Sequence, residues 1–333
     1  MKALIYKNPE TMALEEYPDP QAADGEVVIK IAASGICGSD MHAYFGHDPR
    51  RKPGLVMGHE LSGTICASAS PLYKPGQKVT VDPLITCGYC DYCRTGRDNL
   101  CENRGMVGMS RPGAYAEYMA IPAASVVPIP DDMPHEKAVL TEPASTVVHA
   151  LNFSEARMLR PLQEQRVLVI GGGAIGILMA LLLTSRGVRH LDLAETNPLR
   201  RASAAEHLAA RVIDPVATPP AESSYHYVVD AVGRKVTRDM AIHALKPNGV
   251  LMHMGLQEWG SEVDMRKITL AELIVLGTYT YSYADMQATV QALHDNVFGE
   301  LGWVEYRPLA EGPQAFTTLA QQKTAAAKIV LQP

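Results

Sequence analysis

The chain has 333 residues and a formal net charge of −6 at pH 7, with 47% hydrophobic and 20% charged residues. This length favours two domains, each with its own core, and the composition is that of an ordinary globular enzyme. The negative charge and the lack of any lysine- or arginine-rich run give nucleic-acid binding no electrostatic support. No segment approaches the roughly 18 apolar residues that a membrane span needs. Since the N-terminus also lacks the apolar core of a signal peptide, we expect a cytoplasmic protein.

The first 147 residues are predicted to be rich in β-strands. Short β-branched runs alternate with turn signals such as Ala23-Asp24-Gly25 and Lys74-Pro75-Gly76. Because no two-residue hairpin spacing dominates, a small irregular barrel is expected instead of a regular meander. The predicted strands are residues 1–6, 26–32, 61–67 and 78–82.

From about residue 150 the pattern changes to alternating strands and helices, which predicts a parallel sheet covered by helices on both faces. A helix is expected to start at Asn197-Pro198, an N-cap followed by proline. After residue 277 the pattern changes again, and this last piece is expected to return to the first domain. The predicted strands are residues 167–170, 188–194, 210–213, 227–230, 250–255 and 274–277, followed by a helix at 283–296, a strand near 303–308, a helix and a final strand at 327–331.

The most distinctive stretch is residues 166–197, a strand, a glycine turn, an apolar helix and a second strand. Gly171 makes the tight turn, Gly173 lets a pyrophosphate approach the backbone, and Gly176 lets helix and strand pack closely. The pyrophosphate is expected on the unpaired N–H groups at the positive end of the helix. Three glycines alone are often just a strand–helix turn, but the complete pattern predicts a dinucleotide site. The residues expected there are Gly171, Gly173, Ala174, Ile175 and Gly176.

Glu195 follows the second strand of this stretch, 24 positions after Gly171. It is placed to accept hydrogen bonds from a ribose 2′-hydroxyl. A 2′-phosphate against this carboxylate would put two anions together in a partly desolvated site, so NAD is expected to be preferred over NADP. Arg200 and Arg201 could instead reach toward such a phosphate, and Arg200 is therefore counted among the residues that bind the cofactor.

Four residues spread over the first domain are candidate ligands of a catalytic metal. They are Cys37, His59, Glu60 and Glu142. A thiolate, an imidazole and carboxylates are zinc ligands, and three protein ligands with one open position define a catalytic site. Spacing along the chain does not show that these residues meet. Each of them alone is more often structural, but together, ahead of a nucleotide domain, they favour a catalytic zinc.

Three neighbours of Cys37 could support such a site. Asp40 is a candidate carboxylate that holds the imidazole of His59 in one tautomer. Ser39 and His42 could pass a proton from a buried alcohol to water, since histidine titrates near neutral pH.

Four of the six cysteines lie within 15 residues, in the pattern Cys87-x2-Cys90-x2-Cys93-x7-Cys101. In a chain without an export signal this spacing indicates a metal site, not disulfides. Four thiolates form a closed tetrahedral zinc site that supplies folding energy and leaves no position for a substrate. An iron–sulfur cluster is the competing occupant. Cys66 lies in an apolar strand pattern and is expected to be a small core residue.

Taken together, these motifs resemble the zinc-dependent medium-chain alcohol dehydrogenases, and the resemblance runs over essentially the whole chain. It implies an α/β protein in which a GroES-like β-rich catalytic domain is interrupted by a Rossmann domain with a doubly wound parallel sheet. On this basis residues 1–147 and 278–333 form the catalytic domain and residues 148–277 the Rossmann domain. The matching pieces are G-I-C-G-S-D-M-H (35–42), G-H-E-L-S-G (58–63), the cysteine lobe, G-A-Y-A-E-Y (113–118), T-E-P (141–143), V-I-G-G-G-A-I-G (169–176) and V-V-D-A-V-G (228–233).

The resemblance also implies roles for single residues. Cys37 and His59 match the catalytic zinc ligands of the family. Glu142 stands where many alcohol dehydrogenases have a cysteine ligand, and an acid there resembles the polyol and threonine dehydrogenase branch. In that branch Glu60 can bind zinc or exchange with Glu142, so the resting ligand is left open. The other matches are the proton relay, Ser39 and His42, and a residue that packs near the nicotinamide ring, Thr146.

The sequence thus predicts an NAD- and zinc-dependent oxidoreductase that takes hydride from a secondary alcohol, namely a polyol, sugar acid or hydroxy amino acid. It is expected to hold one catalytic and one structural zinc ion. The alternatives are a zinc-free quinone or enone reductase of the same fold and a non-catalytic nucleotide-binding sensor. A zinc-ribbon nucleic-acid binder would need a basic face that the charge balance does not suggest. Residues 273–280 read as an apolar edge strand, which predicts a homodimer or homotetramer.

Overall fold

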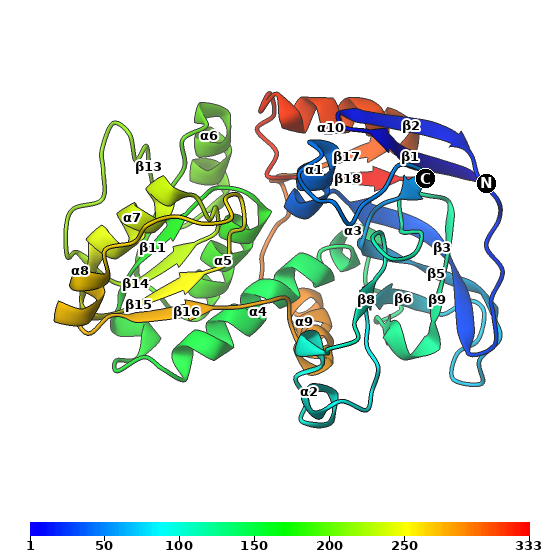
Figure 1. Cartoon of the computed structure of the whole chain (residues 1–333), viewed down its shortest axis with the longest axis horizontal. Coiled ribbons are helices and arrows are strands. Elements are labelled where there is room, and N and C mark those ends of the chain that lie inside the picture. Colours follow the sequence, from blue (N-terminus) through cyan, green and yellow to red (C-terminus); the bar gives the residue numbers. More distant parts are fainter.

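The computed structural model describes residues 1–333, whose strands form two large sheets, one in each half of the molecule (Figure 1). The first half is built on a seven-stranded sheet with the order β10-β6-β5-β3-β18-β17, in which β9 also pairs with β3. Most neighbours in this sheet are antiparallel, but β17 and β18 are parallel. Its strands are β3 (Glu26–Gly35), β5 (Glu60–Ser68), β6 (Lys78–Val81), β9 (Tyr118–Pro122), β10 (Val126–Pro128), β17 (Val304–Pro308) and β18 (Lys328–Gln332).

Two smaller sheets complete this half. One has the order β2-β1-β4 and the other joins β7 to β8. The strands are β1 (Lys2–Asn8), β2 (Thr11–Glu16), β4 (Leu55–Val56), β7 (Leu84–Ile85) and β8 (Gly105–Met106). The helices are α1 (Gly38–Tyr44), α2 (Asp91–Arg94) and α3 (His135–Ala138), with 3₁₀ turns at Asp98–Leu100 and Ala123–Ser125.

The second half is a six-stranded sheet with the order β13-β12-β11-β14-β15-β16, and every neighbouring pair in it is parallel. This is the strand order of a Rossmann fold. The strands are β11 (Arg166–Ile170), β12 (His190–Ala194), β13 (Arg211–Ile213), β14 (Tyr225–Asp230), β15 (Leu245–His253) and β16 (Ile274–Gly277). The helices are α4 (Thr141–Glu155), α5 (Ala174–Ser185), α6 (Pro198–His207), α7 (Lys235–Ala244) and α8 (Met265–Leu270), with a 3₁₀ turn at Leu162–Glu164.

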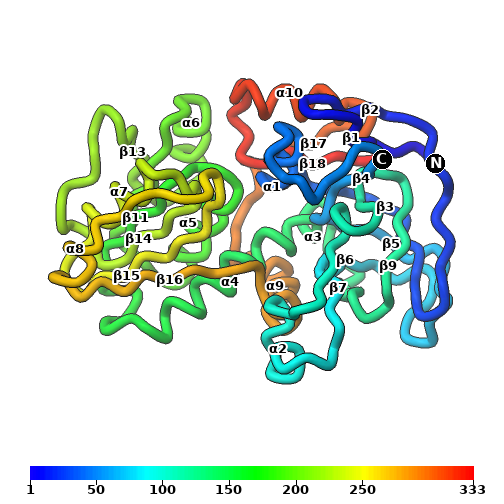
Figure 2. Tube along the Cα trace, in the orientation of Figure 1, coloured from blue at the N-terminus to red at the C-terminus, as the bar shows by residue number.

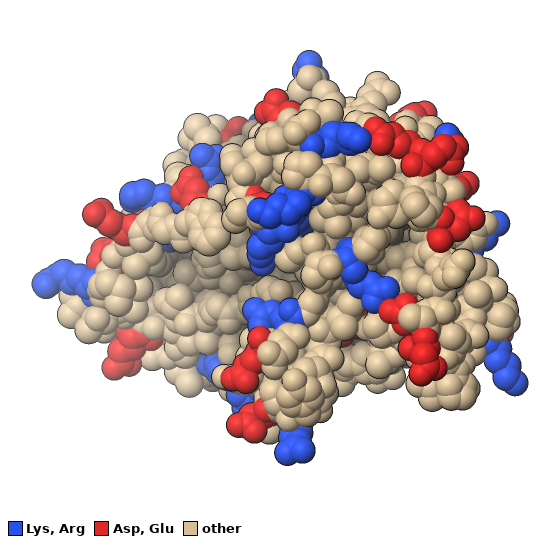
Figure 3. All heavy atoms as spheres, turned by 45° about the vertical axis from the view of Figure 1, so that its right-hand side comes forward, with Lys and Arg blue, Asp and Glu red and all other residues tan.

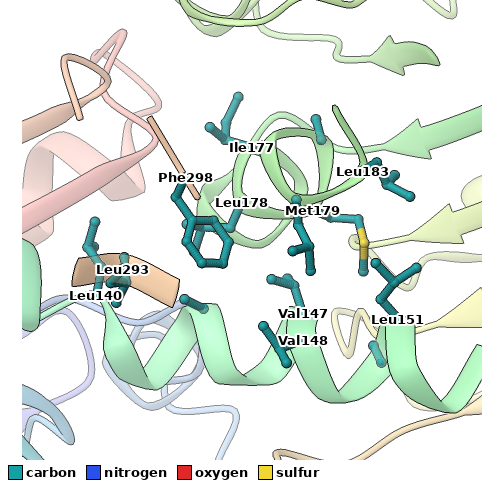
Figure 4. Packing of buried hydrophobic residues seen from close by; sticks show 14 of the residues in the cluster. Leu140, Val147, Val148, Leu151, Ile177, Leu178, Met179, Leu183, Leu293 and Phe298 are labelled. Atoms are coloured by element: carbon teal, nitrogen blue, oxygen red, sulfur yellow. The ribbon is translucent and has the colours of Figure 1, made fainter. Parts of the chain in front are cut away.

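Strand β11 shows why this sheet is apolar on both faces. Val167 and Val169 belong to the core cluster that includes α4 and α5, whereas Leu168 and Ile170 belong to the cluster that includes α7. Alternate residues of a strand point to opposite faces, so helices cover both sides of the sheet. Figure 4 shows α4 packed along α5, with side chains of both helices filling the space between them.

The last part of the chain returns to the first half (Figure 2). Residues Val330 and Leu331 of β18 pair with Gly35 and Ser34 of β3, which confirms the predicted return. Helices α9 (Tyr283–His294) and α10 (Gly312–Ala320) and a 3₁₀ turn at Leu309–Glu311 complete this part. The strands of the second sheet run toward the first half, so their carboxyl ends face it (Figure 1).

The predicted α/β fold with a parallel Rossmann sheet is confirmed, and one residue prediction is wrong. Cys66 is an exposed thiol, not a core residue, because it points to the face of β5 opposite the buried Ile65. Strands β2, β9 and β10 and the two-residue strands β4, β7 and β8 are not predicted from the sequence. Strand β2 ends in two glutamates, and β9 and β10 have only five and three residues and end in proline, so none of them has a clear strand pattern. No helix combines the length and the hydropathy that crossing a bilayer would require.

Candidate active site and metal centres

The pairing of β3 with β5 brings the first candidate metal ligands together. Gly35 at the end of β3 lies opposite Glu60 at the start of β5. Cys37, two residues after β3, is the N-cap residue of α1 and therefore lies beside His59 and Glu60. One ligand atom from each of Cys37, His59 and Glu60 lies within 4.8 Å of the others. Such a set of thiolate, imidazole and carboxylate fits a zinc ion.

Asp40 anchors this cluster from behind. Its buried carboxylate lies 3.5 Å from Nδ1 of His59. It accepts hydrogen bonds from the hydroxyl of Tyr115 at 2.6 Å and from Nη2 of Arg51 at 3.2 Å. Burial opposes ionisation of Asp40, but His59 and Arg51 outweigh burial and lower its pKa well below the usual value. Asp40 is therefore a carboxylate positioned to orient the His59 ring.

Glu60 is tied to a lysine from the far end of the chain. Nζ of Lys328 on β18 donates to both carboxylate oxygens of Glu60, at 2.6 and 2.7 Å, and to the carbonyl of Ile36 at 3.0 Å. Both side chains are almost fully buried. Gly35 leaves room for this pair, because a Cβ there would collide with the Glu60 carboxylate.

Glu142 lies in the first turn of α4, outside the group of three ligands. Its Oε1 accepts a hydrogen bond of 2.9 Å from the buried hydroxyl of Tyr281. Burial raises the pKa of Glu142 to about 7, although the positive charge of nearby His59 opposes the shift. The charge of Glu60 adds to the rise, which means that the two acids belong to one electrostatic cluster.

The predicted relay residues lie on α1, but no hydrogen bond joins them. The Ser39 hydroxyl accepts a bond of 3.3 Å from Arg51, which also bonds Asp40. His42 is half-buried, and burial together with His47 lowers its pKa. Thr146 lies one turn after Glu142 on α4 and donates to the Glu142 carbonyl at 3.5 Å.

The four cysteines of the lobe converge as their spacing predicts, with all four sulfurs within 4.8 Å of one another. The Cys90 and Cys93 sulfurs are 3.5 Å apart, and those of Cys87 and Cys93 are 4.0 Å apart. Zinc–sulfur bonds of about 2.3 Å in a tetrahedron place the sulfurs about 3.8 Å apart, so the lobe fits one zinc ion. A polynuclear iron–sulfur cluster would hold its thiolates farther apart.

The backbone of the lobe favours thiolates. N–H groups of residues 89 and 90 point at the sulfur of Cys87 and lower its pKa to about 6. The N–H of Cys87 in turn donates to the sulfur of Cys101 at 3.3 Å. Preformed donors of this kind stabilise the deprotonated state that a zinc ion needs.

The glycine turn between β11 and α5 fits a dinucleotide. Gly171 has a φ of +104°, and a Cβ at Gly176 would collide with the Gly171 carbonyl. At Gly173, by contrast, a Cβ would meet nothing within 4 Å, so this side of the turn is open for a pyrophosphate. Gly173 is the N-cap residue of α5, and the first N–H groups of this helix are free to bind an anion.

Glu195 is buried at the end of β12 beside this turn. Its two oxygens accept bonds of 2.7 Å from the N–H groups of Gly172 and Asn197. These bonds hold the Glu195 carboxylate at the carboxyl edge of the sheet. The family resemblance implies that the ribose of the coenzyme binds there. Nε of Arg200 lies nearby on α6, buried and without a hydrogen-bond partner. Figure 3 shows a hollow on the surface between the two halves, bordered by several Lys and Arg side chains.

Both halves match known protein families. Residues 23–131 match the alcohol dehydrogenase GroES-like domain, and residues 135–295 match the glucose dehydrogenase C-terminus. The L-threonine 3-dehydrogenase of Mesorhizobium japonicum is 35% identical over 300 residues, which cover 84% of this chain and 83% of that protein. The enzyme of the same name from Stenotrophomonas maltophilia is 34% identical over 295 residues, with 84% of each chain covered.

The chain belongs to the zinc-dependent medium-chain alcohol dehydrogenases, within the polyol and threonine dehydrogenase branch. Two solved structures of this fold each align with 100% of this chain and with 99% of their own chain. They are the short chain alcohol dehydrogenase rspB of Escherichia coli CFT073 with NADH, at 26% identity and a TM-score of 0.91, and a zinc-binding dehydrogenase of Sinorhizobium meliloti 1021 with NADP, at 25% and 0.88.

Membership of the medium-chain dehydrogenases confirms the predicted class of enzyme, an alcohol oxidoreductase that uses zinc and a nicotinamide dinucleotide. It does not favour the zinc-free reductase or the sensor. Four contacts around the dehydrogenase site are not predicted from the sequence, namely those of Arg51, Tyr115, Tyr281 and Lys328. The sequence around each of these four polar residues does not indicate which distant residue it contacts.

Proposed function

We propose that the protein oxidises a secondary alcohol with a neighbouring oxygen, such as a polyol, sugar acid or hydroxy amino acid, and gives the hydride to NAD. The observation that carries this proposal is the cluster of Cys37, His59 and Glu60 with Glu142 beside it. When bound there, zinc supplies a Lewis acid that lowers the pKa of the substrate hydroxyl. Ser39 and His42 then carry the released proton toward solvent.

We assign Glu142, not Glu60, as the resting third ligand of this zinc. Both oxygens of Glu60 are engaged by Lys328, whereas Glu142 has one oxygen bound by Tyr281 and its Oε2 free of hydrogen bonds. A carboxylate with a free oxygen can turn toward a metal without breaking an ion pair. Cys37 and His59 complete the set, while Cys87, Cys90, Cys93 and Cys101 hold the structural ion.

The remaining roles follow the same assignment. Residues 1–147 and 278–333 form the catalytic domain, and residues 148–277 bind NAD through Gly171, Gly173, Gly176 and Glu195. Thr146 packs near the nicotinamide. We place the enzyme in the cytoplasm, where a reducing environment keeps all six cysteines out of disulfides.

The substrate assignment rests on polar groups around Glu142. Tyr281 follows a segment in which the hydroxyl oxygens of Thr278 and Thr280 are buried and have no hydrogen-bond partner. Buried hydroxyls are normally paired, so unpaired ones suit an oxygen-rich ligand. A vicinal diol can place one hydroxyl at the zinc and the other near Glu142, which a simple primary alcohol cannot do.

The first prediction is that catalytic efficiency on some vicinal diol, sugar alcohol, sugar acid or β-hydroxy amino acid exceeds that on ethanol by a factor of about 10⁴. Sites built to bond a substrate hydroxyl discriminate to that degree against analogues that lack it. The measurement is NADH formation across such a panel beside ethanol, butanol and benzyl alcohol. Fastest turnover on a plain primary alcohol would refute the polyol assignment but not the dehydrogenase class.

The second prediction concerns the coenzyme. Glu195→Ala should raise the KM for NAD and reduce the preference for NAD over NADP by about tenfold or more, since a buried carboxylate that repels the 2′-phosphate is lost. The KM values of both coenzymes report the change. Glu206→Ala, which removes an exposed acid of α6, is the matched control. An unchanged NAD/NADP ratio in Glu195→Ala would show that another group, such as Arg200, makes the choice.

The third prediction concerns assembly. Strand β16 has one sheet neighbour, β15, and its Val275 is 48% exposed. An unpaired apolar edge invites pairing with a second copy about a two-fold axis. We therefore expect a homodimer or a homotetramer in light scattering, and Val275→Lys should shift it toward monomer. A wild-type protein that is monomeric at working concentrations would contradict this assembly.

A further inference from the structure

A basic cavity lies at the end of the Rossmann sheet opposite the glycine turn. It has a volume of about 290 Å³ and opens at the first residues of three adjacent strands, Arg166 of β11, His190 of β12 and Arg211 of β13. The coenzyme turn follows the carboxyl end of β11, whereas this cavity lies at its amino end. Because strands rise about 3.3 Å per residue, the five residues of β11 separate the two sites by roughly 15 Å.

The one acid in the cavity wall is already neutralised. Asp192 accepts two bonds from Arg211, from Nε at 2.9 Å and from Nη2 at 2.6 Å. The hydroxyl of Tyr225 donates a third bond to Asp192, at 2.5 Å. This fork occupies both carboxylate oxygens and holds Arg211 in one orientation.

Two further guanidinium groups of the wall are not held in an ion pair, although the charge of Arg166 helps to lower the pKa of Asp192. Arg166 lies over the Tyr225 ring, 5.6 Å from its centroid, and neither Arg166 nor Arg189 takes part in an ion pair. Two more cations lie near Arg166, because its backbone N–H donates to Nδ1 of His226 at 3.0 Å, and Lys246 and Arg160 join burial in lowering the pKa of His226. The chain as a whole has 36 acidic and 30 basic residues, so the surplus of arginines in this cavity wall contrasts with the overall negative charge.

We propose that this cavity binds a small polyanion with at least two anionic groups, of the diphosphate or di- and tricarboxylate class. Arg166 and Arg189 bind it through their planar forks, which match phosphate and carboxylate oxygens. The imidazole of His190 adds a third donor, and the Asp192–Arg211 pair forms the fixed wall. The site is separate from the coenzyme site and does not depend on the proposed substrate.

The test is calorimetric titration of the zinc-loaded protein with pyrophosphate and with citrate, in saturating NADH so that the coenzyme site is filled. We expect saturable binding of either probe by the wild type, and affinity at least tenfold lower in Arg166→Gln/Arg189→Gln. The control Lys74→Gln/Arg266→Gln removes two exposed charges elsewhere and should change affinity less than twofold. Dehydrogenase activity without the anion should match wild type in both variants, which shows that they are folded.

Two results would overturn the proposal. One is equal affinity in the wild type and Arg166→Gln/Arg189→Gln, since any binding would then occur at another site, such as the zinc ions. The other is a lack of saturable binding of both probes up to millimolar concentration. Binding of heparin alone would also overturn it, because the edge would then recognise a long polyanion and not a small one.

Discussion

Cys37→Ser is expected to abolish turnover while leaving a folded protein that holds one zinc ion. Replacing groups that only orient a metal ligand already costs about 10- to 100-fold in affinity or activity, so loss of the thiolate itself should exceed about 100-fold. The Cys87–Cys101 lobe does not touch Cys37 and should keep its own metal. Elemental analysis, the thermal midpoint and the turnover rate measure the three parts of this expectation.

Cys93→Ser should affect the structural metal site instead of the catalytic one. Its sulfur lies 3.5 Å from that of Cys90 and 4.0 Å from that of Cys87, so its loss opens a closed four-thiolate site. The lobe between β7 and β8 has only short elements, and its metal supplies much of its folding energy. We expect a lower thermal midpoint and loss of the structural ion, with activity reduced mainly through instability.

Cys66→Ser is the matched control for both variants, because Cys66 is an exposed thiol that belongs to neither group. It should keep two zinc ions, full activity and wild-type stability. A single zinc ion in fully active wild-type enzyme would contradict the assignment of separate catalytic and structural zinc ions. So would a Cys37→Ser variant that keeps both its zinc ions and its activity.

The features that spacing along the chain predicts are those encoded locally, whereas the joint site of Cys37, His59 and Glu142 is predicted from residue types and the family resemblance. The glycine turn, its helix and Glu195 lie within one strand–helix–strand unit, and the four cysteines lie within one lobe. In both places the number of residues between the side chains determines how far apart they lie in the structure. For Cys66 the same local reasoning is wrong, since an apolar strand pattern does not decide which of its two faces is covered.

The contacts that were missed join residues far apart in the chain. Lys328 and Glu60 are separated by 268 positions, and Tyr281 and Glu142 by 139. They meet because β18 adds to β3 in the seven-stranded sheet and because α9 follows β16 back to α4. Strand pairing over such distances depends on the whole fold, and a single lysine or tyrosine carries no pattern that reveals its partner.

Lys328→Met should destabilise the protein by about 3–5 kcal/mol, the cost of removing one partner of a buried ion pair. Lys328 and Glu60 side chains are 3% and 1% exposed, and Nζ bonds both carboxylate oxygens. The variant would leave the Glu60 carboxylate buried and uncompensated beside Cys37. Urea unfolding of the zinc-loaded wild type and variant, compared at the same metal concentration, measures the difference.

The double variant Glu60→Gln/Lys328→Met separates the ion pair from simple packing. Glutamine keeps the volume of Glu60 but carries no charge, so most of the stability lost in Lys328→Met should return if the unpaired carboxylate is the cause. The activity of Lys328→Met should fall by more than its loss of stability alone would cause. In this variant the freed Glu60 can compete with Glu142 for the metal. Equal stability of Lys328→Met and wild type would mean that Glu60 needs no cation, and our assignment of Glu142 as the resting ligand would lose its support.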